Sequence, residues 1–170
     1  RRAREQARSR MSEPFSASGE ILFSSPHAER IDMYMIEQLQ KFFAGCPYLA
    51  GREIDVDYLA HGKGSFTIEA VPCEPVIRRY LTGGALRQYC FAIVLRESCG
   101  MSPGENMKNE QLCENIADWV ELQSTDGALP ELSGGRTAQS ISVTSGGYMF
   151  GQSENHARYR ICLRMVYTQL

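Results

Sequence analysis

The chain has 170 residues, a mass of 19.1 kDa and a formal net charge of −2, a size that allows one domain with a substantial core. Hydrophobic residues make up 43% and charged residues 22%, which is the composition of a globular protein and excludes a wholly disordered chain. The sequence has no run of about 18 apolar residues, and its first residues lack the apolar core of a secretory signal, so we expect neither a membrane span nor a leader.

The first 25 residues differ in charge from the rest of the chain. Residues 1–10 hold five arginines and one glutamate, whereas the other 160 residues hold 13 basic and 19 acidic side chains. A short apolar patch, Ile21, Leu22 and Phe23, ends this polar stretch. We predict that residues 1–25 form a basic, extended arm whose patch adds a strand to the sheet edge of a neighbouring subunit. The sequence leaves open whether residues 1–10 are native.

The pattern of residues 26–70 predicts one helix followed by two strands. Apolar side chains recur at helical spacing over residues 26–44, with a proline at the start and a glycine after the end. Alternation of apolar and polar residues then predicts strands over residues 52–58 and 66–70. Pro72 interrupts the second strand, because proline has no backbone N–H to donate.

The most informative stretch follows, two predicted strands joined by a tight turn at Gly83-Gly84. Glycine reaches the positive φ angles that such hairpin turns require. Beyond the turn, residues 87–95 alternate large side chains with small ones. This alternation predicts a central strand that is covered on both faces.

The second half of the chain predicts another helix, a loop and two final strands. A start signal at Ser102-Pro103 opens the helix. The residues of this helix that we expect to face the sheet are Leu112, Ile116, Trp119 and Val120. Glycines bracket a loop over residues 126–135. Strands are expected near residues 137–144 and 156–168, joined by an excursion around Tyr148–Phe150.

These elements predict an α+β fold in a single domain over residues 26–170. Their order along the chain is helix, four strands, helix, two strands. Short connections favour antiparallel pairing, so we expect a mostly antiparallel sheet of about five to six strands with the two helices packed on it. Phe91 and Trp119 are expected where the second helix meets the sheet.

Arginines form two groups in the predicted sheet. The last strand places Tyr159, Ile161, Leu163, Met165 and Tyr167 on one face, and Arg158, Arg160, Cys162 and Arg164 on the other. Arg78, Arg79 and Arg87 lie in the hairpin. Arginine makes forked bonds to carboxylates and phosphates, so each group is either a solvated face or a contact with a neighbouring subunit or partner. No predicted helix has a basic face, which argues against sequence-specific DNA reading.

Motifs for catalysis and for metals are missing from the sequence. It contains no Gly-x-Ser-x-Gly nucleophile elbow, no His-Glu-x-x-His zinc helix and no Walker loop. The six cysteines show no Cys-x-x-Cys spacing, so we expect reduced thiols and no zinc. The expectation is a protein without catalytic residues, metal or cofactor, and not an enzyme.

Several short strings are similar to those of one family. They are Val71–Tyr80, Arg87–Tyr89, Leu129–Leu132, Arg136–Ile141, Tyr148–Phe150 and Ala157–Tyr159. Over roughly residues 28–170 the chain resembles the minor capsid or tail terminator proteins of long-tailed, siphovirus-type bacteriophages of Firmicutes-type hosts. The resemblance implies a structural protein of the virion tail or neck that is assembled in the bacterial cytoplasm.

The resemblance also implies partners. Such proteins form a homo-oligomeric ring, usually a hexamer, that caps the tail tube and joins the tail to the head. The implied partners are further copies of the chain, the tail tube protein and a head–tail connector or stopper, with DNA only as cargo in the lumen and no membrane. The arginines of both groups would then lie at the interface between subunits or with the tail tube.

Two other functions remain open at this point. One is a different connector ring, for head completion or tail joining, and the other is a cytoplasmic enzyme or small-molecule binder without a recognisable motif. An enzyme is compatible with a monomer or dimer, whereas a terminator forms rings, so a mass measurement separates these classes. Ring size, host and the face that meets each partner are not determined by the sequence.

Overall fold

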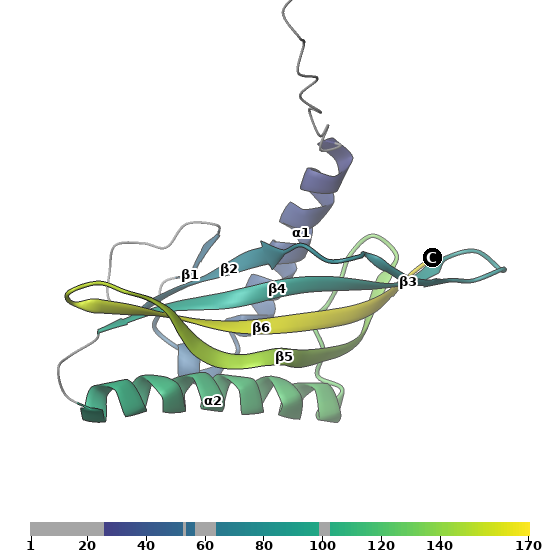
Figure 1. The fold of residues 1–170 in the computed structure, drawn as a ribbon. Coiled ribbons are helices and arrows are strands. Elements are labelled where there is room, and N and C mark those ends of the chain that lie inside the picture. Colours follow the sequence, from purple (N-terminus) through teal and green to yellow (C-terminus); the bar gives the residue numbers. More distant parts are fainter. Residues whose placement is uncertain (1–25, 53, 57–63, 99–102) are drawn as a thin grey trace, which may run out of the picture.

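The computed structural model describes residues 26–52, 54–56, 64–98 and 103–170, and it has an α+β fold (Figure 1). The elements are α1 (Pro26–Phe43), the 3-10 turn η1 (Pro47–Leu49), β1 (Ile54–Val56), β2 (Ser65–Val71), β3 (Val76–Arg79), β4 (Ala85–Ser98), α2 (Pro103–Asp126), β5 (Arg136–Gln152) and β6 (His156–Gln169). The predicted fold class and the predicted order of helices and strands are both confirmed.

The sheet has the order β1-β2-β4-β6-β5, and β3 pairs with β4 beyond the end of β2. All pairs are antiparallel except β1 with β2, which is parallel. The expectation of antiparallel pairing was therefore wrong for β1. A parallel pair requires the chain to return to the same end of the sheet before it pairs. The connection that does this includes residues 57–63, which lie outside the described part of the chain.

The hydrophobic core lies between one face of the sheet and the two helices. Phe43 of α1 occupies its centre, with its ring 6.0 Å from that of Phe91 on β4 and 5.9 Å from that of Trp119 on α2. The residues of α2 predicted to face the sheet do so, Ile116 and Val120 as fully buried side chains and Leu112 and Trp119 as partly buried ones. One cluster of aromatic rings thus joins α1, α2 and the central strand.

The other face of β4 differs from the prediction that helices or strands would cover both sides. No helix of the described residues lies on this face (Figure 1). Ala92 and Val94 are nevertheless fully buried there. They pair with Glu69 and Thr67 of β2 on one side and with β6 on the other. Short side chains on β4 are therefore covered by longer ones that reach over from the neighbouring strands.

Strand β5 is longer than predicted and includes the expected excursion. It runs without a break to Gln152, and Tyr148 and Met149 pair directly with β6. Four shifts of register interrupt this pairing, each a point where β5 carries an extra residue. Bulges of this kind absorb extra residues and bend the strand while keeping it in the sheet, which explains why the sequence pattern resembled a loop.

Helix α2 covers part of the outer edge of β5. The Glu121 carboxylate accepts a hydrogen bond from the Val143 amide at 2.9 Å, and the Ser124 hydroxyl accepts one from the Ile141 amide at 3.2 Å. Unpaired edge amides otherwise invite pairing with another strand. The helix therefore shields this edge as well as the core.

Truncating Phe91 to alanine should remove the centre of the core. We expect Phe91→Ala to lower the free energy of unfolding by about 3–5 kcal/mol, because it leaves a cavity beneath Phe43. Leu81→Ala is the control, since Leu81 is fully exposed and should change stability by less than about 0.5 kcal/mol. Urea denaturation followed by circular dichroism measures both, and equal stability of the two variants would contradict this core.

The contact of α2 with β5 depends on Gly147. A β-carbon at this position would lie 2.8 Å from the Sγ atom of Cys113 and closer still to its Cβ atom. We expect Gly147→Ala to push α2 off the strand and to cost about 1–3 kcal/mol. Gly146→Ala is the matched control, because nothing lies within 4 Å of its β-carbon position. Thermal denaturation should separate the two variants, and identical melting temperatures would refute the close approach.

Candidate interaction surfaces

The β3–β4 hairpin extends past the end of β2 and forms one end of the molecule (Figure 1). Its turn is the predicted one, with positive φ angles at Gly83 and Gly84 and a hydrogen bond from the Tyr80 amide to the Gly84 carbonyl. Gly84 has a second reason to be glycine. A β-carbon there would lie 2.8 Å from the carbonyl oxygen of Gln169, so the hairpin could not lie against the last strand.

The base of the hairpin is held by Gln88. Residues 72–75, between β2 and β3, include two prolines, which cannot donate to a sheet. The Gln88 amide donates instead to the Pro75 carbonyl at 3.0 Å, and its side-chain Nε2 donates to the Glu74 carbonyl at 2.8 Å. Gln88 of β4 thus holds the segment between β2 and β3 against the sheet and fixes where β3 begins.

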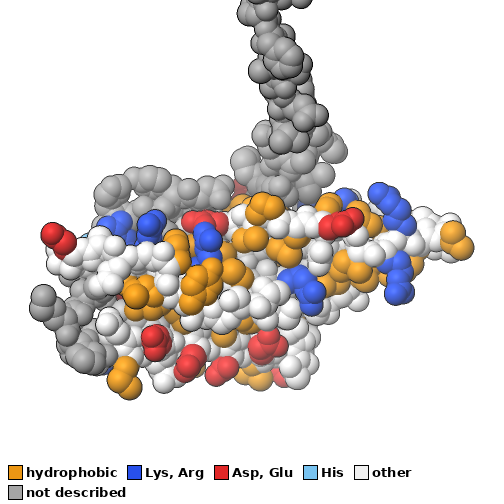
Figure 2. Space-filling model, in the orientation of Figure 1, with side chains coloured by type: hydrophobic (Ala, Val, Ile, Leu, Met, Phe, Trp, Pro, Cys, Tyr) orange, Lys and Arg blue, Asp and Glu red, His pale blue; other side chains and the backbone are white. Residues whose placement is uncertain are grey.

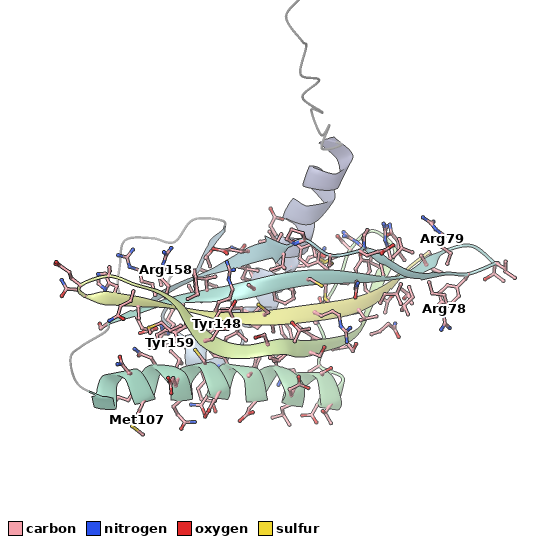
Figure 3. All side chains as sticks on the ribbon, in the orientation of Figure 1. Arg78, Arg79, Met107, Tyr148, Arg158 and Tyr159 are labelled. Atoms are coloured by element: carbon pink, nitrogen blue, oxygen red, sulfur yellow. The ribbon has the colours of Figure 1, made fainter. Side chains whose placement is uncertain are left out.

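The three hairpin arginines occupy two different environments. Arg78 and Arg79 are exposed, follow one another along β3 and point to opposite sides of the hairpin (Figure 3). No carboxylate of the described residues forms an ion pair with either. Arg87 is half-buried, and its Nη1 donates to Oε1 of Gln169 at 2.6 Å. Sequence reasoning grouped the three, but Arg87 is engaged within its own chain.

The hairpin also exposes apolar side chains. Leu81 at the turn is fully exposed, and Ile77 and Tyr80, which precede it, are 47% and 41% exposed. Two free cations beside an apolar tip make a surface that can bind both carboxylates and apolar groups.

The arginines of β6 lie on the sheet face that has no helix, as the alternation predicted. Arg160 reaches over β4, and its Nη2 lies 2.7 Å from Oε2 of Glu69 on β2. Arg158 and Arg160 also lie over the ring of Phe150, at 5.2 and 4.7 Å from its centroid. These distances are those of cation–π contacts. We call Arg158, Arg160, Arg164, Tyr148 and Phe150 the arginine face.

Members of the arginine face differ in what else they contact. Arg158 and Arg164 are exposed, and neither forms an ion pair with a described carboxylate. The side chain of Arg160 is only 31% exposed, because it lies between Glu69 and Phe150. Arg160 therefore holds the sheet together, whereas Arg158 and Arg164 are available to a partner.

A second charged surface, on α2, was missed by the sequence reasoning. The helix has six acidic residues and one basic residue. The exposed acids Glu110, Glu114, Asp118 and Glu121 lie along one side of α2, where Glu121 also reaches the edge of β5, and we call them the acidic face. Figure 2 shows acidic side chains along α2 and basic ones along the strands above it. The spacing of four residues from Glu110 to Glu114 and Asp118, and of three to Glu121, is the signal that could have revealed it.

Like charges four residues apart weaken a helix by about 0.2–0.5 kcal/mol per pair. Glu110, Glu114 and Asp118 form two such pairs. Repulsion between these acids thus destabilises α2, and a basic partner would reduce this repulsion.

Cys90 and Cys113 are poor nucleophiles. Burial raises the pKa of Cys113 to about 12, and neighbouring glutamates act in the same direction. Burial raises the pKa of Cys90 to about 11, and a hydrogen bond with Cys73 adds to this effect. A thiol with such a pKa is almost entirely protonated at neutral pH, and only the thiolate reacts. Cys113 is therefore an unreactive core residue, and the partly buried Cys90 is likewise unreactive at neutral pH.

A shallow groove of about 430 Å³ lies between α1 and the loop after α2. Phe42 and the Leu129–Leu132 string line it, with the exposed Lys41 beside them. Among the described residues, no three His, Cys, Asp or Glu side chains form a group that could hold a metal ion. Leu129 and Leu132 of this string pack partly buried against the core, which holds the loop beside α1.

A comparison with protein-family models and a search of curated proteins each find no match for this chain. Neither helix of the described residues is long and apolar enough to cross a membrane. Ile21, Leu22 and Phe23, with the rest of the predicted arm, lie outside the described residues. The surfaces from which a function can be proposed are therefore the hairpin, the arginine face and the acidic face of α2.

The Arg160–Glu69 pair should couple β6 to β2. We expect a double-mutant cycle with Arg160→Met and Glu69→Gln to give a coupling of about 1 kcal/mol, because the pair is half-shielded and is backed by Phe150. Arg158→Met serves as the control and should show no coupling to Glu69→Gln. Chemical denaturation of the variants measures this, and an additive cycle at Arg160 would show that the pair contributes nothing.

Proposed function

We propose that this protein is a tail terminator of long-tailed bacteriophages, a structural ring protein of the tail or neck. The proposal rests on the strings that resemble this family and on where those strings lie in the fold. Val71–Tyr80 and Arg87–Tyr89 build the projecting hairpin and its base, and Tyr148–Phe150 and Ala157–Tyr159 build one end of the arginine face. Four of the six similar strings therefore contribute to exposed, charged surfaces.

The observation that carries the proposal is the β3–β4 hairpin. It projects from the sheet and presents Arg78 and Arg79 on opposite sides, without acidic partners among the described residues, behind the apolar tip at Leu81 (Figure 3). Guanidinium groups make forked bonds to carboxylates. We infer that the hairpin contacts acidic groups of the tail tube protein or of the head–tail connector.

The ring that we propose is a homo-oligomer, in keeping with the six subunits that the resemblance implies. At one end of the ring, the hairpins would match the end of the tail tube. The opposite end of the ring would offer no surface on which another ring of tube protein could assemble. The ring would thereby stop tube growth and leave a platform for the head, with DNA passing through the lumen. Such a role requires rigid, complementary surfaces and no catalytic residues.

Charge reversal in the hairpin tests this function. In the phage that carries the gene, Arg78→Glu with Arg79→Glu should give folded protein but tails of abnormal length or tails without heads. Arg87 is left unchanged, because its loss would also break its bond to Gln169. The matched control, Arg78→Lys with Arg79→Lys, keeps the charge and should retain at least part of the infectivity. Electron microscopy of particles and plaque titres measure both.

The phenotype separates a terminator from other connector rings. Overlong tails indicate failed termination, whereas tails of normal length that lack heads indicate a role in joining alone. Normal tails and full infectivity in the charge-reversed phage would contradict the proposal.

A further inference from the structure

The fold sorts charge onto two separate surfaces. The arginine face lies on the side of the sheet without a helix, and the acidic face lies along α2, which packs against the opposite side. Figure 2 shows a row of acidic side chains along α2, whereas the basic side chains lie among the strands, together with a few acids. A single chain thus carries two complementary surfaces that cannot meet each other.

The two surfaces also have similar lengths. From Arg158 to Arg164 the strand advances by six residues, which is about 20 Å at the rise of a β-strand. From Glu110 to Glu121 the helix advances by eleven residues, about 16 Å at the rise of an α-helix. A row of cations and a row of carboxylates of this length can lie against one another along most of their extent.

Each surface is incomplete without a partner. Arg158 and Arg164 form no ion pair with a described carboxylate, and the aromatic rings beside them remain partly exposed, Phe150 at 38% and Tyr148 at 43%. Phe150 holds the Arg158 guanidinium in place, which lowers the entropy lost when a carboxylate binds it. On the helix, mutual repulsion of the acids remains until cations approach.

We propose that the arginine face of one copy binds the acidic face of α2 of a second copy. This inference rests on the proposed ring function and names the contact that builds the ring. The two faces differ and lie on opposite sides of the sheet, so the contact is heterologous, and every copy can bind one neighbour through each face. Repetition of a heterologous contact generates a closed ring when the rotation per subunit divides a full turn.

Two charge-reversal variants test the contact. Arg158→Glu with Arg164→Glu changes the arginine face, and Glu114→Lys with Asp118→Lys changes the acidic face. Arg160 and Glu121 are left unchanged, because they bond to Glu69 and to the Val143 amide within the chain. Each variant alone should stay folded, as circular dichroism shows, and self-associate at least about 100-fold more weakly, because like charges then face each other.

Mixing the two variants gives the decisive measurement. In an equimolar mixture, the acidic sheet face of one variant meets the basic helix of the other, and the unchanged faces also match, so association should return with alternating subunits. Native mass spectrometry resolves such assemblies if one variant carries a stable-isotope label. Association of the wild-type protein should also weaken with added salt, since the Debye length falls from about 10 Å at 0.1 M to about 3 Å at 1 M.

The control is Arg78→Glu with Arg79→Glu, which makes the same change in charge at the hairpin and should leave self-association intact. A wild-type protein that stays monomeric, a reversed variant that associates like the wild type, or a mixture that stays dissociated would each overturn the proposed contact. Failure of the contact is distinct from failure of the function. Normal rings in all variants would contradict only this contact. Normal tails from the hairpin variant would contradict the terminator role.

Discussion

Packing of both helices against a single face of the central strands is the constraint on which the other features of this protein depend. Phe43, Phe91 and Trp119 form one aromatic contact between α1, β4 and α2. The large apolar side chains of β4 and β6 that alternate with small or polar ones, from Tyr89 to Leu95 and from Tyr159 to Tyr167, belong to this core. With the apolar surface collected on one side, the opposite side of the sheet is free to carry charged residues, and β6 places Arg158, Arg160 and Arg164 there.

On the sheet face without a helix, other side chains must exclude water from the small residues of β4. Arg160 and Glu69 provide it by pairing across the strand above Ala92 and Val94, with Phe150 against the guanidinium. On the core side, α2 also caps the edge of β5 through Glu121 and Ser124. The same helix that completes the core must therefore present its remaining acids outward, which produces the division of charge.

The charged surfaces have separate places in the proposed assembly. The hairpin lies at one end of the sheet and is suited to a contact along the tail axis, whereas the arginine face and the acidic face lie on the flanks and are suited to contacts around a ring. Arg87 and Arg160, which sequence patterns group with the exposed arginines, instead bond within the chain to Gln169 and Glu69. They support the surfaces that Arg78, Arg79, Arg158 and Arg164 present.

The sequence by itself determined the features that depend on neighbouring residues: the helix that ends at Phe43, the turn at Gly83 and Gly84, and the face of β6 on which its arginines lie. These follow from local periodicity and from the freedom of glycine to adopt positive φ. The tertiary structure alone decided the parallel pairing of β1, the bulged extension of β5 and the partners of individual arginines. Arg160 and Glu69 are 91 residues apart, and only the register of three strands brings them together, because a strand pattern determines the face of a side chain but not which residue lies opposite.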